Sequence, residues 1–331
     1  MERGRDLARA VAVLRGGGLV AFPTETVYGL GADAASDAAV ARIFQAKGRP
    51  RAHPLIVHLA DDARLDDWAI DVPEVARRLA RAAWPGPLTI ILRRGPRVAA
   101  AVTGGAETVG LRVPAHPVAQ ALLRGFGGGI AAPSANRFGA VSPTTAGHVA
   151  GDLGDAVDYL LDGGACEIGV ESTIVDLSRG RAVLLRPGGL ARAQIEPITG
   201  PLGVPDNTSP AAPGTLPSHY APRAEVVAAL PDEVPAAVAG AGALGAKVAV
   251  LAPAAAFAMW AGPPGGPPPA YREYRLPDDI AGMARGLYGA LRDLDAAGVD
   301  VVIAALPPAV GLGEAVGDRL RRAAGPRRNP S

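Results

Sequence analysis

The sequence contains almost no lysine. Of its 33 basic residues only Lys47 and Lys247 are lysine, and the others are arginine. Where arginine replaces nearly every other lysine, a retained lysine indicates a position that arginine cannot fill. An ammonium binds a phosphate oxygen or a small carboxylate as a point charge, whereas a guanidinium presents a planar fork. Lys47 is therefore a candidate functional residue, because its alternative role, stabilising the C-terminal end of a helix over 36–47, would suit arginine equally well.

Cysteine, histidine and aromatic residues are also scarce. The single Cys166 excludes an internal disulfide and is predicted to be a buried apolar residue, and five scattered histidines give no zinc-binding spacing, so no metal ligands are predicted. A net charge of +1 gives no global basic field for a nucleic acid or a membrane. The first residues lack the apolar run of a signal peptide, and the apolar stretch 248–261 is too short to cross a bilayer. We expect a cytoplasmic protein without membrane contact.

The length of 331 residues favours two domains. Strand-like apolar runs recur over the first 190 residues, and the later ones follow one another without helices, which predicts an α/β fold with a mixed sheet. The predicted strands are 55–59, 88–92, 108–113, 129–132, 157–161, 173–177 and 182–185, and the predicted helices are 7–14, 36–47, 73–83, 117–124 and 143–150.

Residues 201–222 are rich in proline and show no periodicity, which predicts an extended linker. The length of this segment and its His219-Tyr220 pair favour a lid or binding loop. After it, predicted strands alternate with helices, which indicates a small βαβ domain with a solvent loop at 262–269 and a solvated Arg327-Arg328 tail. The predicted strands are 223–230, 247–251 and 299–304, the helices are 278–296 and 312–324, and the expected domains are 1–200 and 223–331.

The most informative segment is Gly18–Gly31, which is followed by Lys47–His58. It predicts a buried strand, a polar turn, a helix and a second apolar strand. Hydroxyls and cations then lie at strand ends, where open α/β sheets bind their ligands. Further clusters of polar residues at strand ends are 108–114, 132–136 with 141–145, 169–176 and 185–189.

Several side chains in these clusters indicate anion binding. Arg112 lies inside a predicted buried strand and needs an anion, which is either a ligand or an internal carboxylate. Ser134 and Asn136 follow a strand and resemble a site for an anion or a ribose, whereas Ser142 before Pro143 is typical of a helix N-cap. The sequence lacks a phosphate-binding P-loop, a dinucleotide fingerprint and a nucleophile elbow, so spacing alone leaves the substrate open.

Together these segments resemble the threonylcarbamoyl-AMP synthase family with a YrdC-like domain, in its long form. The resemblance covers about residues 8–200 and extends to 212–222 and 311–320. It implies a twisted mixed α/β sheet followed by a smaller Rossmann-like α/β domain. It also implies a nucleotidyltransferase, L-threonylcarbamoyladenylate synthase, which converts L-threonine, bicarbonate or CO2, and ATP into L-threonylcarbamoyl-AMP and pyrophosphate. The product supplies threonylcarbamoyladenosine modification of tRNA.

The resemblance further implies cofactors, partners and site residues. Mg²⁺ accompanies ATP and is held by phosphate and water, downstream threonylcarbamoyl transferase proteins use the product, and contact with tRNA or double-stranded RNA is a further expectation. His53 stands where the family usually has asparagine. The implied threonine-binding residues are Thr26, His58, Arg112, Ala132 and Ser172. The implied ATP-binding residues are Arg49, His53, Thr108, Ser134, Ser142, Arg186 and Tyr220. The implied catalytic residues, which neutralise phosphate and fix the carbamate, are Lys47, Arg49 and Asn136.

Two other interpretations stay open. A noncatalytic module that binds double-stranded RNA or tRNA would use the same cations on a phosphate backbone, although residues 1–200 carry only a small excess of basic residues. A carbamoyl-adenylate enzyme with another acceptor would use the same chemistry. The set Thr26, His58 and Ser172 favours threonine as the acceptor, by analogy with the family.

Overall fold

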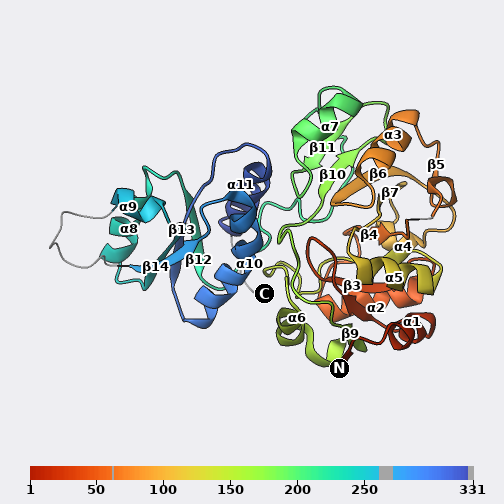
Figure 1. The fold of residues 1–331 in the computed structure, drawn as a ribbon, viewed down its shortest axis with the longest axis horizontal. Coiled ribbons are helices and arrows are strands. Elements are labelled where there is room, and N and C mark those ends of the chain that lie inside the picture. Colours follow the sequence, from red (N-terminus) through yellow and green to blue (C-terminus); the bar gives the residue numbers. More distant parts are fainter. Residues whose placement is uncertain (62, 261–270, 327–331) are drawn as a thin grey trace. The chain divides into compact units, whose positions relative to one another are not determined.

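The computed structural model describes residues 1–61, 63–260 and 271–326 (Figure 1). The predicted loop at 262–269 and the Arg327-Arg328 tail lie outside these residues. The chain divides into two compact units, Met1–Phe138 with Ser142–Thr215, and Gly139–Val141 with Leu216–Ser331. Each unit is described by itself. Within the described residues, no helix is both long and apolar enough to cross a membrane.

The first unit contains one twisted mixed sheet, which confirms the predicted fold class. Strands β4 (Ile56–His58) and β7 (Thr108–Arg112) are parallel, whereas β6 (Leu88–Arg94) is antiparallel to β7 and parallel to β10 (Thr173–Asp176). In the part of the chain that the structure describes, the strand order is β1 (Glu2–Gly4), β9 (Tyr159–Leu161), β2 (Val20–Phe22), β3 (Gly29–Asp33), β8 (Ile130–Ala131), β4, β7, β6, β10 and β11 (Val183–Arg186), with β5 (Ala69–Ile70) beside β6.

The helices of this unit follow from local capping and apolar spacing. In α2 (Asp37–Lys47), the Ser36 hydroxyl accepts a hydrogen bond from the Ala39 N–H at 3.2 Å, and Gly48 ends the helix at a left-handed φ of 63°. Lys47 is thus delivered as the last helical residue. The other helices are α1 (Leu7–Arg15), α3 (Glu74–Ala83), α4 (Ala100–Thr103), α5 (Pro117–Phe126), α6 (Ala146–Leu153) and α7 (Arg192–Thr199), with short 3₁₀ turns at Leu65–Asp67 and Gly154–Ala156.

The two faces of the sheet are covered differently. Because side chains alternate along a strand, Leu111 of β7 enters the main core with α2, α3, α4, α6 and α7, whereas Arg112 faces the other side. On that other side α1 and α5 pack over β2, β8 and β9. Over β4, β6, β10 and β11 the apolar cluster instead contains Ala212, which belongs to the proline-rich segment. This part of the sheet carries the polar residues of the motifs.

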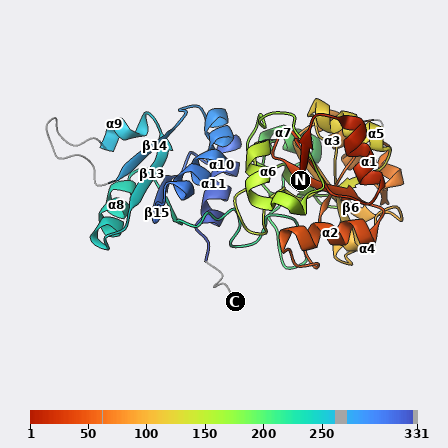
Figure 2. The ribbon, with the colours of Figure 1, turned by 90° about the horizontal axis from the view of Figure 1, so that it is seen from below.

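The second unit contains a parallel sheet between two layers of helices, which confirms the predicted Rossmann-like arrangement. Figures 1 and 2 show the sheet between α8 and α9 on one side and α10 and α11 on the other. Strand β14 (Arg272–Leu276) carries the charged residues Arg272, Glu273 and Arg275 and was not predicted. The remaining elements are β12 (Glu225–Ala229), β13 (Val248–Pro253), β15 (Val301–Ala305), α8 (Val234–Ala243), α9 (Ala256–Trp260), α10 (Ile280–Ala296) and α11 (Leu312–Ala323), in the strand order β12, β15, β13, β14.

The prediction that Ser142 caps a helix was wrong. Helix α6 begins three residues later than expected, at Ala146, and its cap is Thr145, whose hydroxyl accepts from the His148 N–H at 3.2 Å. The Pro143 carbonyl accepts from the Tyr28 N–H at 2.9 Å, so this backbone is paired with the first polar turn rather than with a helix. Ser142 is left to donate its hydroxyl elsewhere.

Gly188 is required where the chain returns past Ser172. A Cβ at this position would lie 2.3 Å from the carbonyl carbon of Ser172 and 2.4 Å from the Glu171 oxygen, and backbone atoms cannot yield as a flexible side chain can. We expect Gly188→Ala to destabilise the chain by about 1–3 kcal/mol in urea unfolding. The control Gly151→Ala, in α6 with nothing near the added methyl, should instead stabilise by about 0.5–1 kcal/mol. Equal effects of the two substitutions would contradict this close approach.

Candidate active site

Three strand ends bring the predicted threonine-binding residues together. Parallel pairing of β4 and β7 sets His58 in register with Arg112, and both side chains are buried. The hydroxyl oxygens of Thr89, in β6, and Ser172, just before β10, lie 2.8 Å apart. Since β6 lies next to β7 and β10 lies next to β6, these hydroxyls lie on the same part of the sheet as the Arg112 guanidinium.

The anion that Arg112 requires is Glu25. Its Oε1 accepts from Arg112 Nη2 at 2.7 Å, and its Oε2 accepts from the Ala115 N–H at 3.1 Å. Both side chains of the ion pair are about 95% buried, with exposures of 4% and 6%. Of the two anions that the sequence allowed for Arg112, a ligand or an internal carboxylate, the structure therefore shows the internal carboxylate. Glu25 was not among the predicted site residues, although it is the one acidic residue of the Gly18–Gly31 segment.

Two buried nitrogen atoms beside this ion pair lack partners. Within the described residues, neither Arg112 Nε nor His58 Nδ1 forms a hydrogen bond. Burial, followed by the neighbouring Arg112 charge, lowers the pKa of His58 to about 3, so its imidazole is neutral at pH 7. A buried polar group without a partner costs about 1–3 kcal/mol. A small carboxylate bound here would accept from the Arg112 Nε–H, and a hydroxyl or ammonium group would suit the neutral imidazole.

The first polar turn lies against the segment that precedes β10. The Ile168 N–H donates to the Glu25 carbonyl at 2.8 Å, and the Gly169 N–H donates to the Thr26 carbonyl at 3.2 Å. The Thr26 hydroxyl is buried and lies 2.8 Å from that of Thr24. The structure therefore brings Thr26 to the segment that leads to Ser172, and Glu25 links the same turn to Arg112.

Lys47 holds the loop that follows β8. Its Nζ donates to the Ser134 carbonyl at 2.6 Å and to the Asn136 carbonyl, and the Phe138 N–H donates to the Lys47 carbonyl at 2.9 Å. Burial lowers the pKa of Lys47 well below its usual value, and the nearby Arg49 charge lowers it further. Lys47 is therefore in direct contact with the segment Ser134-Ala135-Asn136, which is called the Ser-x-Asn motif below and carries Asn136, another implied catalytic residue.

An aromatic ring joins two predicted nucleotide-binding residues. The Arg49 guanidinium lies 5.4 Å from the centroid of the Phe138 ring, and the His53 ring centroid lies 5.3 Å from it. Arg49 Nη2 also donates to the Pro54 carbonyl at 2.9 Å. The sequence analysis missed Phe138, which stands two residues after the Ser-x-Asn motif.

A second set of nucleotide-binding candidates meets at residues 171 and 172. Arg186 Nη2 donates to the Ser172 carbonyl at 2.8 Å, and its Nη1 donates to the Pro213 carbonyl at 2.8 Å. The Ser142 hydroxyl donates to Glu171 Oε1 at 2.6 Å. The proline-rich segment is thus tied to the strand that carries Arg186. Glu171 was part of a predicted cluster but had no assigned role.

Of the remaining predicted residues, Thr108 lies away from Arg112 on the same strand, Tyr220 belongs to the second unit, and Ala132 contributes its backbone. Thr108 begins β7 whereas Arg112 ends it, about 13 Å further along the strand. Tyr220 belongs to the second unit, where its ring stacks on Tyr288 with centroids 5.8 Å apart. Ala132 donates its N–H to the Ile56 carbonyl at 2.9 Å, close to His58 in sequence.

The chemistry of the described residues favours binding of anions over covalent catalysis. Burial raises the pKa of the Cys166 thiol to about 12, so this cysteine is not a thiolate nucleophile. Among the residues that the structure describes, no three His, Cys, Asp or Glu side chains are grouped to hold a metal ion. Lys47, Arg49, Arg112 and Arg186 are buried cations on one unit. Fold and site define an α/β protein whose buried basic side chains are suited to anionic ligands.

Comparison with known proteins identifies the family. One family model, described as Telomere recombination, matches residues 12–188, and another, described as Threonylcarbamoyl-AMP synthase, C-terminal domain, matches 190–325. The chain is 42% identical to the threonylcarbamoyl-AMP synthase of Pyrococcus abyssi, covering 96% of this chain and 93% of that protein, and 42% identical to that of Bacillus subtilis, covering 97% and 94%. The chain belongs to the threonylcarbamoyl-AMP synthase family.

Solved structures of the P. abyssi relative share the whole fold. Sua5 complexed with L-threonine superposes with a TM-score of 0.87 at 41% identity, covering 98% of this chain and 96% of that one. A Sua5 variant in which a consecutive histidine and tyrosine are replaced by alanine gives the same TM-score at 40% identity, covering 98% and 95%. Both domains of the long form are therefore present in this chain.

The buried neutral His58 predicts a dependence of stability on pH. Its folded-state pKa of about 3 lies below the unfolded value of about 6.5, so the unfolded state binds more protons between these values and stability falls as pH falls below 6.5. From pH 7 to pH 5, the wild type should lose about 2 kcal/mol more than His58→Gln in urea unfolding. Equal losses in the two proteins would show that His58 is not held neutral.

Proposed function

We propose that this chain converts L-threonine, bicarbonate or CO2, and ATP into L-threonylcarbamoyl-AMP and pyrophosphate. The chain belongs to a family of enzymes of the nucleotidyltransferase type. The observation that best supports threonine as substrate is that two buried nitrogen atoms, Arg112 Nε and His58 Nδ1, have no hydrogen-bond partner among the described residues. The Arg112 Nε–H suits an amino-acid carboxylate, and the neutral imidazole suits a hydroxyl or an ammonium group. A relative of the same fold has been solved with L-threonine.

The proposed chemistry needs no covalent enzyme intermediate. The threonine amine attacks CO2, which forms the carbamate C–N bond and releases a proton. A carbamate oxygen then attacks the α-phosphorus of ATP, and the bond to the β-phosphate oxygen breaks to release pyrophosphate. Such a step depends on positioning and charge neutralisation. In this proposal, Arg112, His58, Thr26 and Ser172 orient threonine, with the Ala132 backbone beside them.

In the same proposal, basic residues near the threonine-binding residues bind the nucleotide. Arg49 and Lys47 neutralise phosphate charge, and Asn136 fixes the carbamate end. Mg²⁺ enters with ATP as part of the substrate and neutralises phosphate charge in the same way. The remaining ATP-binding assignments are His53, Thr108, Ser134, Ser142, Arg186 and Tyr220, and of these Arg186 links Ser172 to the proline-rich segment.

The product defines the protein's place in a reaction sequence. A threonylcarbamoyl transferase in the cytoplasm takes the group from the adenylate and places it on tRNA adenosine. Contact with tRNA or double-stranded RNA by this chain is part of the same proposal. The expected domains remain 1–200 for catalysis, 201–222 as a lid or linker and 223–331 as the second α/β domain.

One assay separates this function from its alternatives. Pyrophosphate release from ATP by the purified full chain should require both threonine and bicarbonate, and the product should carry label from ¹⁴C-bicarbonate and from threonine. ATP consumption that requires bicarbonate but accepts another amine or alcohol would instead identify a different acceptor. No ATP consumption together with tight binding of tRNA would indicate the noncatalytic module.

Replacement of Arg112 by lysine should affect threonine selectively. Arg112→Lys keeps the charge that pairs with Glu25 but removes the Nε–H and the planar fork, so it should raise the KM for threonine by about 10-fold or more and leave the KM for ATP within about 2-fold. Thermal unfolding controls for loss of structure. Equal effects on both substrates would restrict Arg112 to a structural ion pair.

Replacement of Lys47 should lower turnover more than it changes substrate affinity. Lys47→Ala removes the donor to the Ser134 and Asn136 carbonyls as well as a buried cation, so kcat should fall by a factor on the order of 10² or more. Lys247→Ala, which changes the chain's other lysine in the second unit, is the matched control and should keep near-normal kcat. A folded Lys47→Ala protein with normal pyrophosphate release would contradict the assignment.

A further inference from the structure

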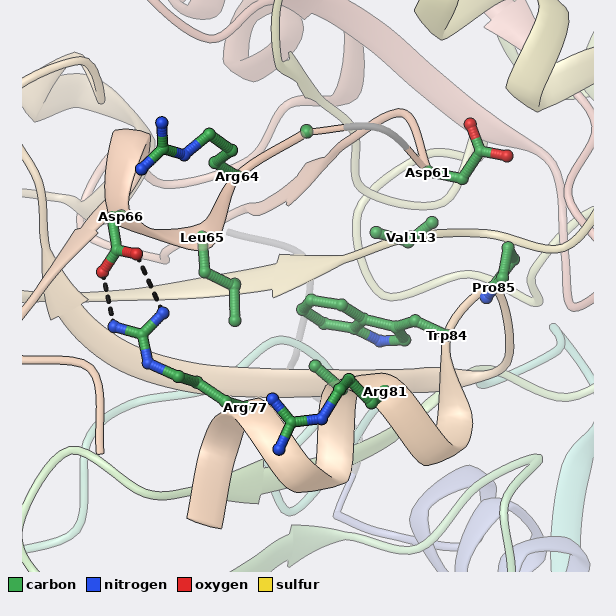
Figure 3. Close-up of a pocket in the computed structure, with 11 residues that line it drawn as sticks. Asp61, Arg64, Leu65, Asp66, Arg77, Arg81, Trp84, Pro85 and Val113 are labelled. Carbon is green, nitrogen blue, oxygen red and sulfur yellow. Dashed lines mark hydrogen bonds and ion pairs between the residues drawn. The ribbon is translucent and has the colours of Figure 1, made fainter. Parts of the chain in front are cut away.

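A separate pocket of about 380 Å³ lies beside Trp84 in the first unit (Figure 3). One wall is α3, which supplies Arg77 and Arg81, and the opposite wall is the segment that carries Arg64 and Leu65. This volume falls in the range of small-molecule sites, which are typically about 300–1,000 Å³. None of the residues that line it is among the threonine, ATP or catalytic assignments.

The pocket opens on the opposite face of the sheet from the candidate active site. Val113 lines the pocket and packs in the main core with Leu79 and Ala80 of α3. Arg112, the preceding residue, points the other way, to Glu25. Because consecutive side chains of an extended strand point to opposite faces, a ligand in the pocket and a ligand on Arg112 are separated by the sheet.

The inner part of the pocket is suited to a flat apolar group. Trp84 Nε1 donates to the Leu88 carbonyl at 2.8 Å, so the polar edge of the indole is already bonded and its orientation is fixed. In Figure 3 the indole lies between Val113 and Arg81 and extends toward Leu65. The exposed indole face, Leu65 and Val113 would contact a planar ring by stacking and apolar packing.

The rim of the pocket is suited to an anion. Arg77 is neutralised by Asp66 through two hydrogen bonds of 2.7 and 2.8 Å, which make a fixed wall. Arg81 pairs with Glu74, but both side chains are about two-thirds exposed, and exposed ion pairs are weak. Within the part of the chain that the structure describes, the Arg64 side chain forms no hydrogen bond or ion pair. Two cations are thus available at the rim.

We propose that this pocket is a second ligand site, which binds a small anion that carries a planar ring. The ring lies on Trp84 between Leu65 and Val113, and Arg64 and Arg81 hold the charged group. A nucleoside monophosphate and an aromatic carboxylate share this chemistry. The site is distinct from the substrate site, because its ligand contacts the face of the sheet that α3 covers, whereas Arg112 lies on the opposite face.

Titration calorimetry of the full chain tests the proposal with four probes: GMP, 4-hydroxybenzoate, guanosine and inorganic phosphate. GMP is used because the proposed substrate is an adenine nucleotide. GMP or 4-hydroxybenzoate should bind at least 10-fold more tightly than guanosine or phosphate, and the tighter of the two identifies the charged group as a phosphate ester or a carboxylate. Arg64→Ala should weaken that binding at least 5-fold, and Trp84→Leu should weaken it further.

Two control variants locate the binding. Arg223→Ala changes an exposed arginine of the second unit and should leave binding unchanged. Arg186→Ala changes a proposed ATP-binding residue and should also leave it unchanged. Because Arg64 is exposed and has no ion-pair partner among the described residues, Arg64→Ala tests the site even if Trp84→Leu fails to fold. Binding that is insensitive to Arg64→Ala, binding that is lost in Arg186→Ala, or no binding of either ring-bearing anion would overturn the proposal.

Discussion

The buried ion pair between Glu25 and Arg112 is the interaction on which the candidate site depends. It joins the first polar turn to the end of β7, and the Ala115 N–H completes the coordination of the carboxylate. Removal of one partner from a buried pair typically costs about 3–5 kcal/mol, because the other charge is left without compensation. The pair uses Nη2 of the guanidinium, and Nε has no hydrogen-bond partner among the residues that the structure describes. The same contact therefore ties the turn to β7 and fixes the orientation of the Arg112 guanidinium.

The other buried cations hold backbone segments in place. Lys47 donates to two carbonyls of the loop after β8, and Arg186 donates to the carbonyls of Ser172 and Pro213. Hydrogen bonds from charged donors are stronger than those between neutral groups, so these loops are fixed by interactions that also concentrate positive charge. These backbone segments are therefore held in place by contacts within the unit, without a bound ligand.

Elements with strong local signals were predictable, and those that depend on neighbours were not. The strand 108–113 and helix α2 follow from apolar runs and from the Ser36 and Gly48 caps. Strand β3 is rich in glycine and forms because β2 and β8 flank it. A Cβ at Gly31 would lie 2.7 Å from an Ile130 methyl carbon, so a larger residue does not fit at this position. The strand therefore lacks the β-branched residues by which a strand is usually predicted from the sequence. Strand β14 is charged because much of it is exposed, and apolar periodicity is absent from it.

The sequence by itself determined the family, the mixed α/β class and the set of polar residues at strand ends, because motif order and apolar runs are local properties of the chain. Only the tertiary structure decided which groups meet. In the folded chain Arg112 pairs with Glu25, which is 87 positions away in the sequence, and Ser142 pairs with Glu171, which is 29 positions away. Such pairings depend on strand order and register, which bring distant segments together, and no local pattern in the sequence records them.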